Sequence, residues 1–218
     1  MQGATLAVTE STIAAYEVRD PDVRLMLEVR DDNAAAFEEL MLRYQDRVVT
    51  VLEHLVNKRG QAEDLAQEVF LRVFRSRKRY QPNAKFSTWL FTIANNVASN
   101  ANRSLARKRE VHLAAGSSNS ENGLPLEQLA LDASGLMPAR QLDTAERAEV
   151  VRRAVQSLNE RQRMALMLSK FEGMSYAEIA ETMGLSVQAT KSLLCRAREN
   201  LRSILEPYVV EGDRPAEP

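Results

Sequence analysis

Apolar residues recur at helical spacing along most of the chain, and no segment alternates apolar and polar residues in the manner of a strand. This pattern predicts helices over about 22–30, 33–55, 61–77 and 87–109. Gly60 separates the second and third helices, and the stretch "YQPNAK" breaks the pattern before the fourth, because Pro82 cannot continue a helix. We therefore expect an all-α fold. The inward stripe of the third helix is Ala62, Leu65, Ala66, Val69 and Val73.

Residues 114–143 gather Gly, Ser, Asn and Pro with little periodicity, which predicts a linker between two small helical domains. Part of this linker is expected to pack transiently or to dock on a partner, because it carries Leu124, Leu126, Leu129 and Leu131. We expect an N-terminal extension over 1–20, a first domain over 21–112, a linker over 113–143, a second domain over 144–206 and an acidic tail over 207–218.

The second domain carries the most specific local signals. Asn159 and Gln162 resemble a capping pair for a helix that reaches about Phe171. Ser175 and Glu178 form a capping box for a short helix. We expect Tyr176, Ile179, Ala180 and Met183 to form its inward stripe.

Gly184 is placed to end this short helix in the left-handed conformation, with Leu185 beyond it, and Ser186 then caps another helix. The inward face of that last helix is predicted to be Val187, Thr190, Leu194, Ala197 and Leu201. The opposite face carries Gln188, Lys191, Ser192, Cys195 and Arg196.

Polar side chains on one face of a helix that follows a tight turn suit the reading of base edges in the major groove. We therefore interpret this segment as a helix-turn-helix, the alternative being a helical hairpin with a solvated outer face. The lone Cys195 excludes an internal disulfide, and we interpret it as a small contact residue and not as a reactive thiol.

The net charge of −1 argues at first against a nucleic-acid partner. The distribution of charged residues along the chain reverses that argument, because residues 69–109 contain no Asp or Glu. This stretch favours a polyanion-binding surface over a merely solvated face. Its basic residues are Arg72, Arg75, Arg77, Lys78, Arg79, Lys85, Arg103, Arg107, Lys108 and Arg109.

Phe70, Leu71 and Phe74 lie off the inward stripe of the predicted helix 61–77, beside charged and polar residues. An apolar patch with a charged rim predicts a surface for a protein partner, whereas a helix buried on two sides is the alternative. Trp89 shares one side of its helix with Ile93 and Val97, which favours a packing role.

Four segments together resemble bacterial RNA polymerase sigma factors of the extracytoplasmic-function type. They are "AFEELMLRYQDRVV", "AEDLAQEVFLRVFRS", "FSTWLFTIANN" and "LNERQRMALMLSKFEGMSYAEIAETMGLSVQATKSLLCRAREN", in the family's order and spacing. The resemblance covers most of residues 20–205. It implies a first domain that binds core RNA polymerase and the minus-ten element, and a second domain that binds the minus-thirty-five element. An anti-sigma partner is a further implication.

The resemblance also assigns residues. The core-polymerase surface falls on Asp64, Leu65, Gln67, Glu68, Phe70 and Leu71. The family's minus-ten loop matches residues 80–86 and its base-pocket asparagine matches Asn96, so the expected minus-ten set is Tyr80, Gln81, Asn83, Lys85, Phe86, Asn96, Asn100 and Arg103. Contacts with the minus-thirty-five element are expected from Gln188, Lys191, Ser192, Cys195 and Arg196.

Three departures from the family pattern matter. Asn159 stands where most relatives have proline, which leaves the function intact. The loop "YQPNAK" lacks the acidic residue and the glycine common in relatives, and Leu193 and Cys195 replace larger or basic residues. The sequence preference at both promoter elements is therefore open.

Two other functions compete with this reading. A conventional two-domain regulator would bind duplex DNA tightly without polymerase. A metal-dependent hydrolase built on Glu63, Asp64 and Glu68 is disfavoured, because the chain has only two histidines and no Gly-rich phosphate loop. We expect no catalysis, cofactor or metal. No apolar run approaches a membrane span of roughly 20 residues, and no secretory signal is recognisable, so we expect a cytoplasmic protein without membrane insertion.

Overall fold

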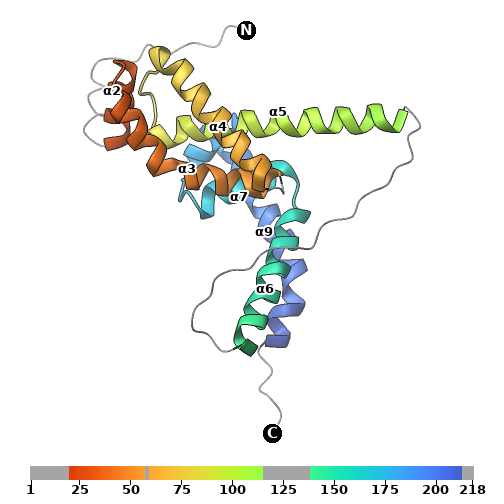
Figure 1. Cartoon of the computed structure of the whole chain (residues 1–218). Coiled ribbons are helices and arrows are strands. Elements are labelled where there is room, and N and C mark those ends of the chain that lie inside the picture. Colours follow the sequence, from red (N-terminus) through yellow and green to blue (C-terminus); the bar gives the residue numbers. More distant parts are fainter. Residues whose placement is uncertain (1–19, 57–58, 115–137, 213–218) are drawn as a thin grey trace.

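The computed structural model describes residues 20–56, 59–114 and 138–212. Within these ranges every regular element is a helix, which confirms the all-α prediction (Figure 1). The elements are α2 (Pro21–Arg30), α3 (Ala34–Val56), α4 (Arg59–Ser76), the 3₁₀ turn η1 (Arg77–Arg79), α5 (Phe86–Ala114), α6 (Pro138–Ser157), α7 (Glu160–Lys170), α8 (Tyr176–Met183) and α9 (Val187–Gly212).

Helices α2 to α5 form the first domain, in which α3 packs against α2, α4 and α5. Asp20 fixes two of these helices at once. Its Oδ1 accepts a hydrogen bond from the backbone N of Asp22 at 3.0 Å, and its Oδ2 accepts one from the backbone N of Phe86 at 3.0 Å. One carboxylate therefore satisfies orphan N–H groups at the start of α2 and at the start of α5.

Local sequence signals set the starts of α7 and α8 and the end of α8 within the second domain, as predicted. The capping box of Asn159 and Gln162 starts α7, and that of Ser175 and Glu178 starts α8. Gly184 ends α8 in the left-handed region, with φ 64° and ψ 39°. The backbone N of Leu185 then donates to the carbonyl of Ala180 at 2.8 Å, which closes the helix end. The predicted helix-turn-helix is present.

Several predicted positions differ in the structure. Tyr176 and Val187 are exposed and not inward-facing, because each lies in the first turn of its helix, beyond the reach of the core. Helix α9 continues to Gly212, so the segment predicted as a frayed tail is helical as far as the structure describes it. The predicted linker overlaps the ends of α5 and α6, and its four leucines lie outside the described residues, as do residues 1–19 and 213–218.

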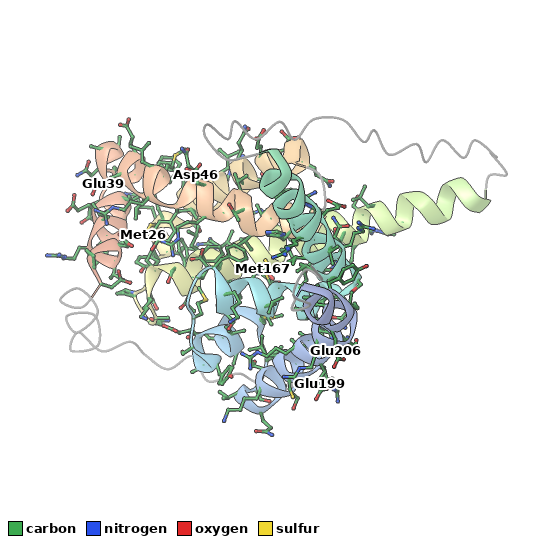
Figure 2. The ribbon with its side chains drawn as sticks, turned by 90° about the horizontal axis from the view of Figure 1, so that it is seen from below. Met26, Glu39, Asp46, Met167, Glu199 and Glu206 are labelled. Carbon is green, nitrogen blue, oxygen red and sulfur yellow. The ribbon has the colours of Figure 1, made fainter. Side chains whose placement is uncertain are left out.

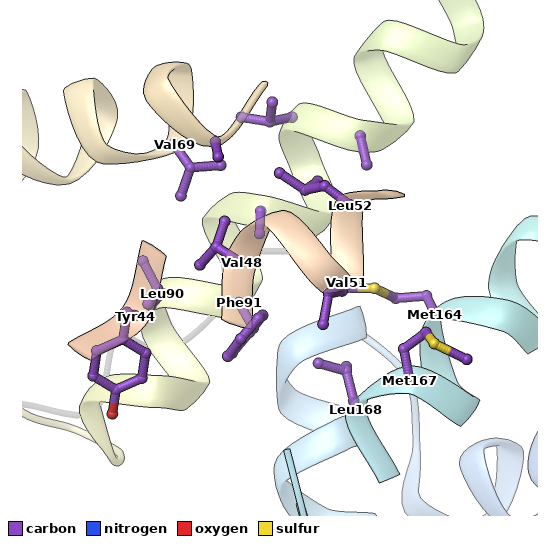
Figure 3. Close-up of a cluster of buried hydrophobic side chains, with 14 of the residues drawn as sticks. Tyr44, Val48, Val51, Leu52, Val69, Leu90, Phe91, Met164, Met167 and Leu168 are labelled. Atoms are coloured by element: carbon purple, nitrogen blue, oxygen red, sulfur yellow. The ribbon is translucent and has the colours of Figure 1, made fainter. Parts of the chain in front are cut away.

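The two domains share one apolar core. Helix α3 contacts α7, and α5 contacts α8. Figure 3 shows Met164, Met167 and Leu168 of α7 facing Val51 of α3. Seen from below in Figure 2, Met167 lies between the helices of the two domains, whereas Glu199 and Glu206 lie on the middle and the C-terminal half of α9. Figure 1 shows the C-terminal part of α5 projecting away from this body.

Candidate nucleic-acid and protein interfaces

An apolar groove runs between α3 and α4, with a volume of about 730 Å³. It exists because the inward stripe of α4 faces the core, which leaves the flanking residues Leu71 and Phe74 on the surface, 49% and 40% exposed. The rings of Phe37 and Phe74 meet across the groove with centroids 5.2 Å apart. Its lining residues are Phe37, Met41, Gln45, Asp46, Val49, Glu63, Ala66, Gln67, Phe70, Leu71 and Phe74.

The predicted polymerase-binding residues divide in this region. Gln67, Phe70 and Leu71 line the groove, with Phe70 buried at its base. Asp64 is exposed outside the lining, Leu65 packs against the core, and Glu68 accepts a hydrogen bond from Arg72 Nε at 2.7 Å. The α3 wall of the groove consists of residues that no sequence pattern assigns to the site, namely Phe37, Met41 and Val49. Phe37 was visible in the apolar pattern of its helix, but its pairing with α4 is a tertiary property.

The loop before α5 is anchored by its two aromatic ends. Tyr80 and Phe86 are both buried, and the ring of Tyr80 meets Trp89 edge to face while that of Phe86 meets Tyr44 in the same way. Burial raises the pKa of the Tyr80 hydroxyl. Because both rings are buried, neither has a free face that could stack on a base. The expectation that Tyr80 and Phe86 contact DNA is therefore wrong, and the two residues position the loop instead. The packing role predicted for Trp89 is confirmed, since it packs partly buried against the core.

The exposed part of this loop carries the remaining predicted residues, Gln81, Asn83 and Lys85. The backbone N of Asn83 donates to the carbonyl of Gln81 at 2.9 Å, which tightens the turn around the buried Pro82. The Nζ of Lys85 forms an ion pair with Glu178 Oε1 at 2.8 Å. The loop is therefore held at its ends and in contact with the second domain at Lys85.

A second pocket, of about 480 Å³, lies where the end of α4 and η1 meet α5. Its lining residues are Arg72, Arg75, Ser76, Arg79, Ile93 and Asn96. Three guanidinium groups make this pocket positive, which suits a phosphate. The exposed Asn96 adds a group that both donates and accepts hydrogen bonds. Asn96 and these arginines are well separated in the sequence, and the structure brings them together in one pocket.

Asn100 and Arg103 continue the same exposed face of α5 beyond the pocket. Arg103 Nη2 donates to Asn100 Oδ1 at 2.9 Å, and Arg103 Nε donates to the carbonyl of Ser99 at 3.2 Å. These bonds hold the guanidinium against the helix. Both residues are thus oriented toward solvent, as a DNA-facing surface requires.

The first three turns of α9 present the predicted base-reading face. Thr190, Leu194 and Ala197 are fully buried against the rest of the domain. Cys195 Sγ lies 3.6 Å from Glu199 Oε1, to which it donates one helical turn further on. All five predicted residues are exposed on the other side: Gln188, Lys191, Ser192, Cys195 and Arg196.

Within the described ranges, no group of three or more His, Cys, Asp or Glu side chains could hold a metal ion. No helix in the described part of the chain has the length and apolar character needed to cross a membrane.

The chain matches two protein-family models. Residues 40–108 match Sigma-70 region 2, and residues 148–201 match Sigma-70, region 4. The first match contains the basic pocket and the lining of the groove apart from Phe37, and the second contains the helix-turn-helix. RNA polymerase sigma factor CarQ of Myxococcus xanthus is 36% identical over 185 residues, covering 85% of this chain and 98% of the relative. The ECF RNA polymerase sigma-E factor of Escherichia coli K12 is 30% identical, covering 86% and 96%.

Solved structures share the fold. CnrH in complex with the cytosolic domain of CnrY has a TM-score of 0.61 and 22% identity, covering 86% of this chain and 99% of that chain. The sigma factor RpoE of Bartonella quintana, in complex with the anti-sigma factor NepR, has a TM-score of 0.56 and 24% identity, covering 78% and 96%. The chain matches both regions in the family's order, and it matches relatives over nearly their whole length. It therefore belongs to the sigma-70 family, as a sigma factor of the extracytoplasmic-function group.

Proposed function

We propose that this sigma factor binds core RNA polymerase through the α3–α4 groove, while the pocket at the other flank of α4 binds the minus-ten element. The observation that carries the proposal is the placement of both surfaces on one helix. Leu71 and Phe74 of α4 line the groove, whereas Arg72 and Arg75 line the basic pocket. Polymerase bound on one flank would therefore bring promoter DNA to the other.

The groove fits a partner segment with apolar side chains bordered by basic ones. Its floor and walls are mainly apolar, and its rim carries the carboxylates of Asp46 and Glu63. Apolar anchors in a groove supply most of the affinity of such interfaces, and the charged rim selects the partner. A surface of core polymerase with these properties is the proposed occupant.

The basic pocket would hold the separated non-template strand of the minus-ten element. The arginines suit its phosphates, and Asn96 suits the edge of an unstacked base. Extruding a base costs a few kcal/mol, and a pocket that stacks or hydrogen-bonds it returns about 1–3 kcal/mol. The exposed loop residues Gln81 and Asn83 lie before α5 and would extend this contact along the strand.

The α9 face would read the minus-thirty-five element as duplex DNA. Arg196 and Lys191 are long basic side chains on the exposed side of a helix whose start is fixed by a tight turn. This is the geometry with which the second helix of a helix-turn-helix enters the major groove. Side-chain amides and guanidinium groups there can pair with base edges.

The proposed role needs binding energy from this chain and no covalent chemistry, cofactor or metal. Core polymerase would carry out nucleotidyl transfer, and the chain would act in the cytoplasm, where polymerase and DNA are found. An anti-sigma factor would control it by covering the polymerase or DNA surfaces. Support comes from the similar structures of CnrH and RpoE, which are of complexes with the cytosolic domain of CnrY and with NepR.

Transcription in vitro tests the proposal. Purified core polymerase, alone or with the chain, is given a library of promoter fragments, and association of the chain with core is followed by gel filtration. We expect initiation from a discrete set of promoters only when both proteins are present. The proposal is overturned if the chain neither associates with core nor directs initiation. Tight binding of the free chain to duplex DNA without core would instead indicate a conventional regulator.

A further inference from the structure

The turn between α2 and α3 places its backbone in the left-handed region without a glycine. Asp32 has φ 69° in this turn, whereas the other two described residues with positive φ are Gly173 and Gly184. Residues with a side chain rarely adopt this conformation, although Asp and Asn tolerate it better than most. Glycine would end α2 equally well. A carboxylate at this position therefore indicates a role for the side chain itself.

The carboxylate of Asp32 holds two basic side chains of η1, against which α2 packs. Its Oδ1 accepts a hydrogen bond from Arg77 Nε at 3.1 Å and lies 3.0 Å from Arg77 Nη2. Its Oδ2 accepts a hydrogen bond from Lys78 Nζ at 2.5 Å. The hydrogen bonds from Lys78 and Arg77 lower the pKa of this carboxyl, so it is ionised at neutral pH. Both of its oxygens are thus used to hold η1.

Arg77 connects this carboxylate to the apolar groove between α3 and α4. Its Nη1 donates to the carbonyl of Phe74 at 2.9 Å, while Nε and Nη2 are turned toward Asp32. Each of the three guanidinium nitrogens therefore has an acceptor, which fixes the plane of the group. The guanidinium also lies over the ring of Phe74, 4.0 Å from its centroid, as a cation–π contact. Asp32 thus sets the position of the cation that covers this ring.

Phe74 contributes a half-exposed ring to the groove. It is 40% exposed, and it meets Phe37 on the other wall with centroids 5.2 Å apart. Its contacts with Arg77 and Phe37 hold the ring in one place. A side chain that is already ordered loses less entropy when a partner covers it, so a fixed ring favours binding.

Stability alone does not account for the contacts of Asp32. The side chains of Asp32 and Lys78 are 57% and 54% exposed, and ion pairs at such positions contribute little to the free energy of folding. Arg77 is only 22% exposed, because it lies between the carboxylate and the ring. What the carboxylate supplies is therefore mainly the orientation of Arg77.

We propose that Asp32 is a positioning residue for the polymerase groove: through Arg77 it holds the ring of Phe74, so that this wall is formed before polymerase binds. The positioning is a property of the free chain, whereas its effect on polymerase binding rests on the proposed function. A direct contact between Asp32 and polymerase is the competing explanation. The two explanations differ in whether Phe74 is needed for the effect.

Asp32→Gly separates the side chain from the backbone. Glycine adopts φ 69° without strain, so the turn should be kept while the carboxylate is lost. Asp31→Gly is the matched control, because it makes the same change one position earlier, where the carboxylate lies 3.5 Å from Arg30 Nε. Chemical denaturation checks that the variants are folded. Arg77→Met removes the same contact from its other side and leaves the turn untouched.

Fluorine NMR tests the positioning in the free full-length chain, with para-fluorophenylalanine in place of Phe74. We expect one narrow resonance for the parent chain and for Asp31→Gly. Asp32→Gly and Arg77→Met should both broaden this resonance and move it toward the shift of a solvent-exposed ring, because the guanidinium no longer stays over the ring. A resonance that Asp32→Gly leaves unchanged overturns the positioning.

Surface plasmon resonance with immobilised core polymerase tests the effect on binding with unlabelled proteins. Asp32→Gly should weaken binding by about two- to tenfold, the range for ordering one side chain, and Asp31→Gly should bind as the parent chain does. In a Phe74→Leu background, Asp32→Gly should have no further effect. An undiminished effect in that background overturns positioning in favour of a direct contact with polymerase.

Failure of the proposed function gives a different pattern. If the groove is not the polymerase site, Leu71→Ser in the groove binds core as tightly as the parent chain, while the fluorine resonance still moves in Asp32→Gly. If Leu71→Ser weakens core binding but Asp32→Gly does not, the groove stands as the polymerase site and the contribution of Asp32 is overturned.

Discussion

The rings of Tyr80 and Trp89 meet edge to face, with centroids 4.8 Å apart and planes inclined by 62°. This contact fixes the start of the loop before α5, and the hydrogen bond from the backbone N of Phe86 to Asp20 fixes its end. The exposed residues between them are thus presented from a rigid base. Such preorganisation reduces the ordering cost of binding a flexible strand.

Tyr80→Phe should leave the protein as stable as before or more stable by up to about 1 kcal/mol. The ring packing is retained, and the lost hydroxyl is buried with no hydrogen-bond partner among the described residues. Chemical denaturation followed by circular dichroism measures the effect. A loss of more than about 1 kcal/mol would mean that the hydroxyl is bonded after all.

Leu71→Ser should weaken binding to core polymerase by about 10- to 100-fold, since burying a leucine contributes about 1.5–3 kcal/mol. Leu42→Ser is the matched variant, because Leu42 is an even more exposed leucine, at 67%, outside the groove. Surface plasmon resonance with immobilised core compares them. Equal affinities of the two variants would exclude the groove as the polymerase site.

Asn96→Ala should slow open-complex formation by about 3- to 10-fold, the effect of losing one or two hydrogen bonds to a base, while core affinity is unchanged. Asn95→Ala removes the same group one position along α5, outside the pocket lining. Permanganate footprinting of thymines in the opened region gives the rates. A parallel loss of core binding in Asn96→Ala would show that the residue is structural.

Arg196→Ala should weaken promoter binding by the complex of this chain with core polymerase. The expected loss of binding free energy is about 1–3 kcal/mol on promoters with an intact minus-thirty-five element. Arg202→Ala, also exposed on α9 but outside the predicted face, should have a smaller effect. Sequencing of transcripts from a promoter library gives the selected sites. A promoter profile that is the same for Arg196→Ala and the parent chain would contradict its role.

His54 should make stability depend on pH. Burial lowers the pKa of its imidazole below the ordinary value of 6.5, and Arg152 and Arg163 lower it further, against the opposing effect of Glu53. As the pH falls below about 6.5, the unfolded chain therefore takes up this proton before the folded one, and the free energy of unfolding declines. His54→Gln should flatten that decline in denaturant titrations between neutral and mildly acidic pH. An identical pH profile for the variant would assign the dependence to other groups.

The helix-turn-helix was predictable because its signals lie within a few residues of each other. Ser175, Glu178 and Gly184 act on their own helix ends, and the structure places each as expected. The spacing of Leu71 and Phe74 likewise predicted a surface patch. The other wall of the groove was not predictable, because it depends on how α3 packs against α4.

Aromatic residues in the loop before α5 were the main misassignment. Tyr80 and Phe86 were expected at the DNA, but packing with Trp89 and Tyr44 buries them. A ring that anchors a loop and a ring that contacts a base look the same in one sequence. The contact of Lys85 with Glu178 was likewise beyond sequence reasoning, because it joins side chains far apart in the chain.

The groove and the basic pocket are both lined by side chains of α4. Both surfaces therefore depend on the direction in which each side chain leaves this helix. Each residue turns an α-helix by about 100°, so inserting a single residue ahead of Leu71 would rotate the whole downstream turn. Leu71 would then point toward the basic pocket, where Arg72 lies, and Arg72 would take the buried position of Val73. The register of α4 is consequently constrained more tightly than its composition, and insertions there should be tolerated less well than substitutions.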